Sequence, residues 1–277
     1  MRRYLNIGIL LAIISGCSDE IALPVPQEIL VVEGWLTDQD TIQQVRISRT
    51  VSFESENSST TVSRASVHIR SNLENYELMH TKDGIYQSAV EFAGVAGRSY
   101  WLEVSLEGQL IASKKEVMRT VPRLDSIYFD FFERQSEINP QLEELVYYPI
   151  GYFSDNGEVQ NFYRWKFERN GIPFNEPEDI FILEDRFLNG LDSIKNEFTA
   201  FEYELSDTIS IELQEISFDA YNYLRLLRLQ TTSLGTRSGT TPSVVRGNMV
   251  DSSNPANLVL GYFGVISTTS DTLVINP

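Results

Sequence analysis

The feature that most restricts the fold is a series of short runs in which apolar and polar residues alternate. The run at 44–53, QVRISRTVSF, shows this alternation, and so does ASVHIRS at 65–71. A period of two places apolar side chains on one face of a β-strand. Asp83-Gly84, a strong hairpin signal, and Glu107-Gly108 separate further runs of this kind. Seven such strands, with no helical period between them, predict a β-sandwich at 28–120.

A second β-rich region follows residues 119–127, RTVPRLDSI, where Pro122 interrupts strand pairing. Three Asn-Gly dipeptides then separate alternating runs, and Asn-Gly favours type I′ turns between antiparallel strands. These dipeptides are Asn156-Gly157, Asn170-Gly171 and Asn189-Gly190. We therefore predict a second domain at 121–277, either an antiparallel β-sandwich or a barrel-like sheet.

One helix is expected within this second domain, at about 218–230. Ser217 can cap its first turn, and Asp219 carries a negative charge there. Apolar residues follow at the spacing i, i+3, i+4 and i+7: Ala220, Tyr223, Leu224 and Leu227. We expect this stripe to pack on a sheet or to close one end of a barrel, as part of a core rather than as a groove for a partner.

The first residues, MRRYLNIGILLAIISGCSDE, read in the order basic, apolar, small. The apolar run is about ten residues long, which is too short to span a bilayer as a helix. This order predicts a signal peptide at 1–16. The segment up to Cys17 resembles the bacterial lipoprotein signal, in which the cysteine thiol is acylated and the chain is cut before it. Residues 17–27 would then form a lipidated tether.

The residues behind Cys17 bear on its location. Ser18, Asp19 and Glu20 resemble the signal that exports Bacteroidota lipoproteins to the outer face of the outer membrane; the alternative is an ordinary solvated tether. Two or three acyl chains would anchor the protein durably, since each buried methylene contributes about 0.8 kcal/mol.

Cys17 is the only cysteine, so no disulfide can form within the chain. The net charge of −17 makes nucleic acid an unsuitable partner.

Four segments in order resemble a known family: ILVVEGWLTD, GIYQSAVEFAGVAGRSYWLEV, VPRLDSI and RGNMVDSSNPANLVLGYFGV. Together they are similar to the domain-of-unknown-function family 4249, a set of Bacteroidota lipoproteins. The resemblance covers nearly all of the mature chain. It implies a surface lipoprotein, often encoded beside TonB-dependent transporters, with no established reaction and no catalytic residues to carry over. By its pattern, the first domain also resembles Ig-like or transthyretin-like sandwiches.

The sequence contains no pattern that singles out catalytic or metal-binding residues. The two histidines, His68 and His80, lie in expected strands without the spacing of metal ligands. DRFLNGLD at 185–192 echoes a calcium loop only in part, and a turn explains it better. With 39 acidic residues, carboxylate pairs suited to glycoside hydrolysis are possible, but no spacing singles one out. We therefore expect no metal, no cofactor and no enzymatic activity.

A ligand region is expected where the irregular stretch 231–257 meets the last strands, because long loops in compact domains are often functional. Arg237 and Arg246 could supply cations there, and Tyr262 and Phe263 could supply aromatic surface.

A recurring Asp-Ser/Thr-apolar pattern resembles the O-glycosylation signal of exported Bacteroidota proteins. The hydroxyl residues concerned are Thr41, Ser126, Ser193, Thr208 and Thr272. A structural reading is equally good, since Asp and Ser/Thr close a turn before a strand begins. Both readings stay open at this point.

These observations predict a non-enzymatic outer-membrane lipoprotein facing the cell exterior. It would assist a TonB-dependent transporter by binding a nutrient or gating its entry. The alternatives are an adhesin or structural component of the envelope, and a carboxylate-dependent hydrolase.

Overall fold

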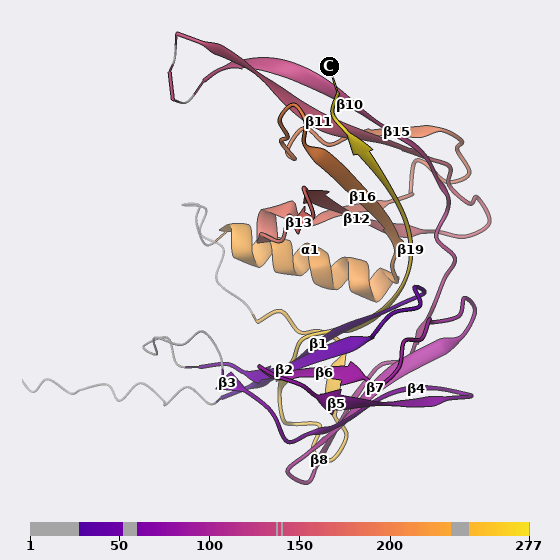
Figure 1. The fold of residues 1–277 in the computed structure, drawn as a ribbon. Coiled ribbons are helices and arrows are strands. Elements are labelled where there is room, and N and C mark those ends of the chain that lie inside the picture. Colours follow the sequence, from indigo (N-terminus) through magenta and orange to yellow (C-terminus); the bar gives the residue numbers. More distant parts are fainter. Residues whose placement is uncertain (1–27, 52–59, 137, 140, 234–243, 277) are drawn as a thin grey trace, which may run out of the picture.

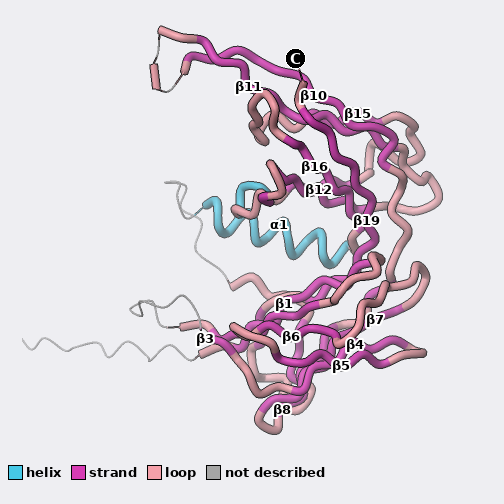
Figure 2. Tube along the Cα trace, viewed as in Figure 1, coloured by secondary structure: helices cyan, strands magenta, loops and turns pink. Residues whose placement is uncertain are grey.

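The fold is known from a computed structural model that describes residues 28–51, 60–136, 138–139, 141–233 and 244–276. This part of the chain is mostly β, with a single α-helix among the described residues (Figures 1 and 2). None of the helices there has the length and hydropathy of a membrane span.

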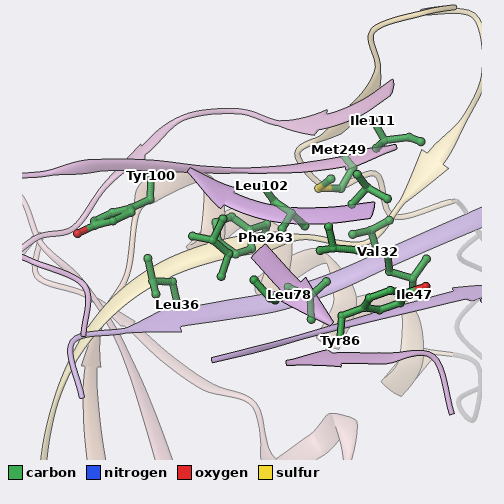
Figure 3. Close-up of a cluster of buried hydrophobic side chains, with 14 of the residues drawn as sticks. Val32, Leu36, Ile47, Leu78, Tyr86, Tyr100, Leu102, Ile111, Met249 and Phe263 are labelled. Carbon is green, nitrogen blue, oxygen red and sulfur yellow. The ribbon is translucent and has the colours of Figure 1, made fainter. Parts of the chain in front are cut away.

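The first body contains the N-terminal strands, drawn in indigo to purple in Figure 1. Neighbouring strands pair in the order β1-β2-β6-β5-β4-β7-β8. In addition, β3 pairs with β2, and β9 pairs with β7. The strands are β1 (Leu30–Thr37), β2 (Gln44–Arg49), β3 (Thr60–Thr61), β4 (Ser66–Ser71), β5 (Asn75–His80), β6 (Ile85–Ser88), β7 (Ser99–Leu106), β8 (Gln109–Ser113) and β9 (Glu116–Val117). The inward residues of these strands form one apolar core, which includes Val32, Ile47 and Leu102 (Figure 3).

The expected turns of this body are confirmed. Asp83 and Gly84 have φ of 51° and 73° and join β5 to β6. Glu107 and Gly108 have φ of 52° and 83° and join β7 to β8. Positive φ at both central positions matches the right-handed twist of the flanking strands. His68 and His80 lie in β4 and β5, as expected.

The second body is a sandwich of two antiparallel layers, so of the two predicted forms the sandwich is the one that occurs. One layer is a separate sheet with the order β10-β11-β15. The other contains β12, β13, β14, β16 and part of β19. The elements are β10 (Leu124–Gln135), β11 (Glu143–Phe153), β12 (Phe162–Arg169), β13 (Ile172–Pro173), the 3₁₀ turn η1 (Pro177–Asp179), β14 (Phe181–Glu184), β15 (Ile194–Glu197) and β16 (Thr208–Glu215). Aromatic residues from both layers, Phe153, Tyr163, Trp165 and Phe167 among them, fill the core between them.

The Asn-Gly prediction is confirmed at one of three places. Asn170 and Gly171 have φ of 53° and 77° and turn β12 into β13. The loops at 156–157 and 189–190 are not hairpins, because each carries the chain from one layer of the sandwich to the other. The two loops lie against one another: a Cβ added to Gly157 would stand 2.9 Å from the Cα of Gly190.

The last strand, β19 (Phe263–Val274), belongs to both bodies (Figure 1). Its first part runs parallel to β1, and its second part runs antiparallel to β16. Two short strands before it also join the first body: β17 (Met249–Asp251) pairs with β8, and β18 (Val259–Leu260) pairs with β1. Residues from 249 to 265 of the predicted second domain therefore pack with the first body, and β17 lies inside the stretch expected to be irregular.

The helix α1 (Phe218–Ser233) covers the face of β12, β16 and β19 that points away from the sandwich core. The predicted helix is confirmed, and it continues three residues beyond the expected end. Ser217 caps it, since its Oγ accepts a hydrogen bond from the Ala220 amide at 3.0 Å. Ala220 and Leu224 are buried against Phe162 and Ile266 of the sheet, as expected for a core-facing stripe. Figure 1 shows α1 between the two bodies.

Candidate functional site

A cleft of about 250 Å³ lies where α1 meets β1, β12 and η1. We call it the α1 cleft; its lining includes Trp35, Arg164, Asp179, Tyr223, Leu227 and Tyr262. They come from four elements and from the segment before β19. The cleft therefore exists only when both bodies and the helix are assembled.

One wall of the α1 cleft is aromatic. The rings of Trp35 and Tyr262 stack with their centroids 5.6 Å apart, and those of Tyr262 and Tyr223 stack at 4.8 Å. Strand alternation explains the place of Trp35: Val32 and Leu36 of β1 point into the first core, so Trp35 points the other way. Its indole lies over Gly264, where an added Cβ would stand 2.1 Å from Trp35 Cζ3. A glycine at 264 is thus needed for this wall.

The middle ring of the wall is held by a buried hydrogen-bond network. The Tyr262 hydroxyl donates to Glu116 Oε1 and lies 3.3 Å from Ser217 Oγ. Glu116 also accepts bonds from Asn248 Nδ2 and the Val265 amide. Burial raises the pKa of Tyr262, and the neighbouring Glu116 charge raises it further. Tyr262 therefore stays a neutral donor, fixed in orientation.

Arg164 supplies a cation at the edge of this wall. Tyr163 and Trp165 of β12 are buried in the sandwich core, so Arg164 between them points to the cleft side. Its Cζ lies 5.6 Å from the Trp35 ring centroid, a cation–π contact. Its Nε is enclosed and has no hydrogen-bond partner among the described residues. Burial lowers the pKa of Arg164, an effect that the charge of Glu212 opposes.

The cleft also contains three carboxylates. Asp179 accepts a hydrogen bond from the Glu176 amide at 2.8 Å, and together these two residues form the capping box of η1. Glu33 is exposed on β1, and its charge helps burial to raise the pKa of Tyr223 to about 12. Two of the three carboxylates therefore have a local structural task.

This arrangement is suited to binding. Stacked rings offer a flat apolar surface, and a guanidinium offers a planar pair of donors. The lining contains no histidine, serine or cysteine among the described residues. No group of histidine, cysteine and acidic side chains in the described ranges could hold a metal ion.

The predicted ligand residues are only partly brought together. Tyr262 lines the α1 cleft, whereas Arg246 lines a smaller hollow of about 180 Å³ that shares Tyr223 and Tyr262 with the cleft. Phe263 lies wholly inside the first core, so the expectation that it contacts a ligand does not fit its position (Figure 3). Arg237 lies outside the described residues.

The predicted modification sites differ in placement. Cys17, Ser18, Asp19 and Glu20 lie outside the described residues. None of the five hydroxyl residues of the Asp-Ser/Thr pattern is buried: Thr41, Ser193 and Thr272 are exposed, and Ser126 and Thr208 are half-buried. The turn-before-strand reading fits Ser193 and Thr208, which directly precede or begin a strand. It does not fit Thr272, which lies within β19 and contacts Ser210 Oγ at 3.0 Å.

Sequence reasoning missed Trp35, Arg164 and Tyr223 as site residues. The signal for Arg164 was present, since a charged residue between Tyr163 and Trp165 must lie on the opposite face of its strand. What the pattern could not show is that α1 and β1 enclose that face.

A family model described as "Domain of unknown function (DUF4249)" matches residues 18–272, which is most of the chain. No curated protein matches it.

Proposed function

The chain belongs to the DUF4249 family, and from this premise we propose that it is a lipid-anchored ligand-binding protein of the outer membrane. In this proposal it faces the cell exterior and hands a nutrient to a TonB-dependent transporter. The observation that carries the binding role is the α1 cleft, an aromatic-walled cavity assembled from both bodies.

Binding is better supported than catalysis. Apolar, largely preformed clefts with a few polar groups are the usual form of ligand sites. Hydrolysis of a glycoside by two carboxylates needs a facing pair that flanks the scissile bond. In the α1 cleft, Glu176 and Asp179 are engaged in capping η1. Glu33 is therefore the one lining carboxylate without such a task, and a single carboxylate does not make a pair.

The lipid anchor and the outward display rest on the sequence alone. They follow from the resemblance of the segment before Cys17 to a lipoprotein signal and from the acids behind it. A protein anchored in this way would hold the cleft close to a transporter in the same membrane, where tethering raises the effective concentration of each partner.

The test uses the full chain in its native host. Wild type and Leu227→Trp are tagged, and nutrient uptake and transporter co-purification are measured in each strain. Leu227 lines the cleft and is half-buried, so a tryptophan there fills it. Leu226→Trp is the matched control, because Leu226 is exposed and lines the neighbouring hollow of Arg246 rather than the α1 cleft, so the pair of variants separates the two cavities.

We expect Leu227→Trp to lose nutrient uptake while still co-purifying with the transporter, and Leu226→Trp to behave as wild type. Unchanged uptake in Leu227→Trp, or in a strain that lacks the protein, would contradict a ligand role for the cleft. Failure to recover a TonB-dependent transporter with the wild type after cross-linking would contradict the partnership.

A further inference from the structure

We propose that the α1 cleft binds a carboxylate carried on a ring-sized group, with Arg164 as the residue that pairs with the carboxylate and the Trp35–Tyr262–Tyr223 wall as the surface for the ring. The inference rests on the proposed ligand-binding role and adds the chemical class of the ligand.

Among the described arginines, Arg164 is the one that has a buried guanidinium nitrogen, Nε, without a hydrogen-bond partner. Seven described arginines have a carboxylate oxygen within 4.0 Å: Arg49, Arg70, Arg98, Arg119, Arg134, Arg169 and Arg186. No carboxylate of the described residues lies that close to Arg164, although its Nε is enclosed.

A buried guanidinium N–H without an acceptor is unfavourable, because the Nε donor of Arg164 has lost water and gained no hydrogen-bond partner. Arg164 keeps its cation–π contact with Trp35 and feels the charge of Glu212, whose Oε1 already accepts a hydrogen bond from Gln214. A carboxylate on a ligand would supply a counter-charge and two acceptors that match the planar fork of the guanidinium.

The aromatic wall of the α1 cleft indicates the shape of the ligand. Two stacked pairs, with interplanar angles of 27° and 23°, give the cleft a continuous aromatic wall beside Arg164. Such a wall suits the face of an aromatic ring or the C–H face of a sugar ring. The volume of about 250 Å³ is below the range of about 300–1,000 Å³ that is usual for drug-sized ligands, so one ring-sized group fits.

The charged residues of the α1 cleft limit the charge of the ligand. Glu33, Glu176 and Asp179 line the same cleft as Arg164 and Lys166, so its carboxylates outnumber its cations by one, and the chain as a whole has a net charge of −17. A polyanion would be repelled by these groups, whereas a single carboxylate could reach Arg164. The remainder of the ligand should therefore be neutral or positively charged.

The experiment compares matched acids and neutral analogues on the full mature chain in detergent. One pair is N-acetyl-tyrosine and its amide, which represents a peptide end. The other is methyl glucuronide and methyl glucoside, which represents an acidic sugar. Binding is titrated by NMR or fluorescence on wild type, Arg164→Met, Arg164→Lys and the control Arg186→Met. Arg186 lies in a loop outside the cleft, and its side chain is 65% exposed.

We expect the acid of at least one pair to bind wild type about tenfold more tightly than its neutral analogue, a preference typical of a charged pairing. Arg164→Met should abolish the preference, Arg164→Lys should restore part of it, and Arg186→Met should leave it unchanged. The pair that responds identifies the source of the carboxylate.

Three results would overturn the inference. They are equal binding of acid and neutral analogue, a preference that survives in Arg164→Met, and no binding of either acid up to about 10 mM, which is weaker than most specific sites. Tight binding of the neutral analogues alone would contradict a carboxylate ligand for Arg164, but it would still support the proposed ligand-binding role of the cleft.

Discussion

A pH-dependent loss of stability is expected from Glu215, which ends β16 next to the junction of the two bodies. Its side chain is 0% exposed. Oε1 accepts a hydrogen bond from Asn161 Nδ2 at 3.0 Å, and Arg119 Nη1 lies 3.8 Å away. Oε2 has no partner among the described residues. Burial is the largest influence and raises the pKa of Glu215 to about 8, although Asn161 and Arg119 oppose it.

The magnitude follows from the gap between this pKa and the value of 4.5 for the exposed group in an unfolded chain. Between these two values the folded protein holds a proton that the unfolded chain has released. The free energy of unfolding therefore falls as pH rises, by about 1.4 kcal/mol per pH unit. The stabilisation is complete below about pH 4.5 and is lost by about pH 8, a total of up to ~5 kcal/mol.

Glu215→Gln isolates this effect, because glutamine resembles the protonated acid and does not titrate. Urea unfolding of wild type and variant is measured at pH values from about 5 to about 8. The difference in free energy of unfolding should grow in favour of the variant by ~1.4 kcal/mol for each pH unit. Glu133→Gln, at an exposed position of β10, is the control. A difference between Glu215→Gln and wild type that does not change with pH would refute the reasoning.

Three further changes have defined outcomes. Ser217→Ala removes the cap on Ala220 and should lower the free energy of unfolding by about 1 kcal/mol, measured by urea titration of the helical signal. Gly264→Ala puts a Cβ 2.1 Å from Trp35 Cζ3 and should cost about 1–3 kcal/mol with a shift in tryptophan emission; wild-type emission would contradict the packing. Cys17→Ala should move the protein from the membrane fraction to the soluble fraction, since no acyl chain can be attached. Persistence of the Cys17→Ala protein in washed membranes would contradict the lipid anchor.

Short sequence signals, such as a helix cap or a turn dipeptide, were sufficient to predict elements whose shape depends on nearby residues alone. The helix at Phe218–Ser233 follows from its cap and its apolar spacing, both of which lie within the segment. Asp83-Gly84 forms the expected hairpin because its flanking strands are neighbours in the sheet. Strand alternation likewise places Val32 and Ile47 in the first core.

The same dipeptide signal failed where the partner of a strand comes from elsewhere. Asn156-Gly157 stands between two alternating runs, as Asn170-Gly171 does, yet β11 pairs with β10 and β15 rather than with β12. A turn sequence permits a hairpin, but competition among all strands for partners decides whether one forms. The loop therefore crosses between the layers of the sandwich.

The sequence by itself determined the β-rich class, the helix at Phe218–Ser233, the family and the buried face of strands such as β1 and β2, because alternation, capping and turn chemistry act over a few residues. Only the tertiary structure decided that β19 joins both bodies and that the segment from 249 to 265 returns to the first. It also decided that Trp35, Arg164 and Tyr223, far apart in the chain, line one cleft. Contacts between residues far apart in the chain depend on which strand and helix faces are buried against each other. The packing of the whole chain decides this, and no short segment carries that information.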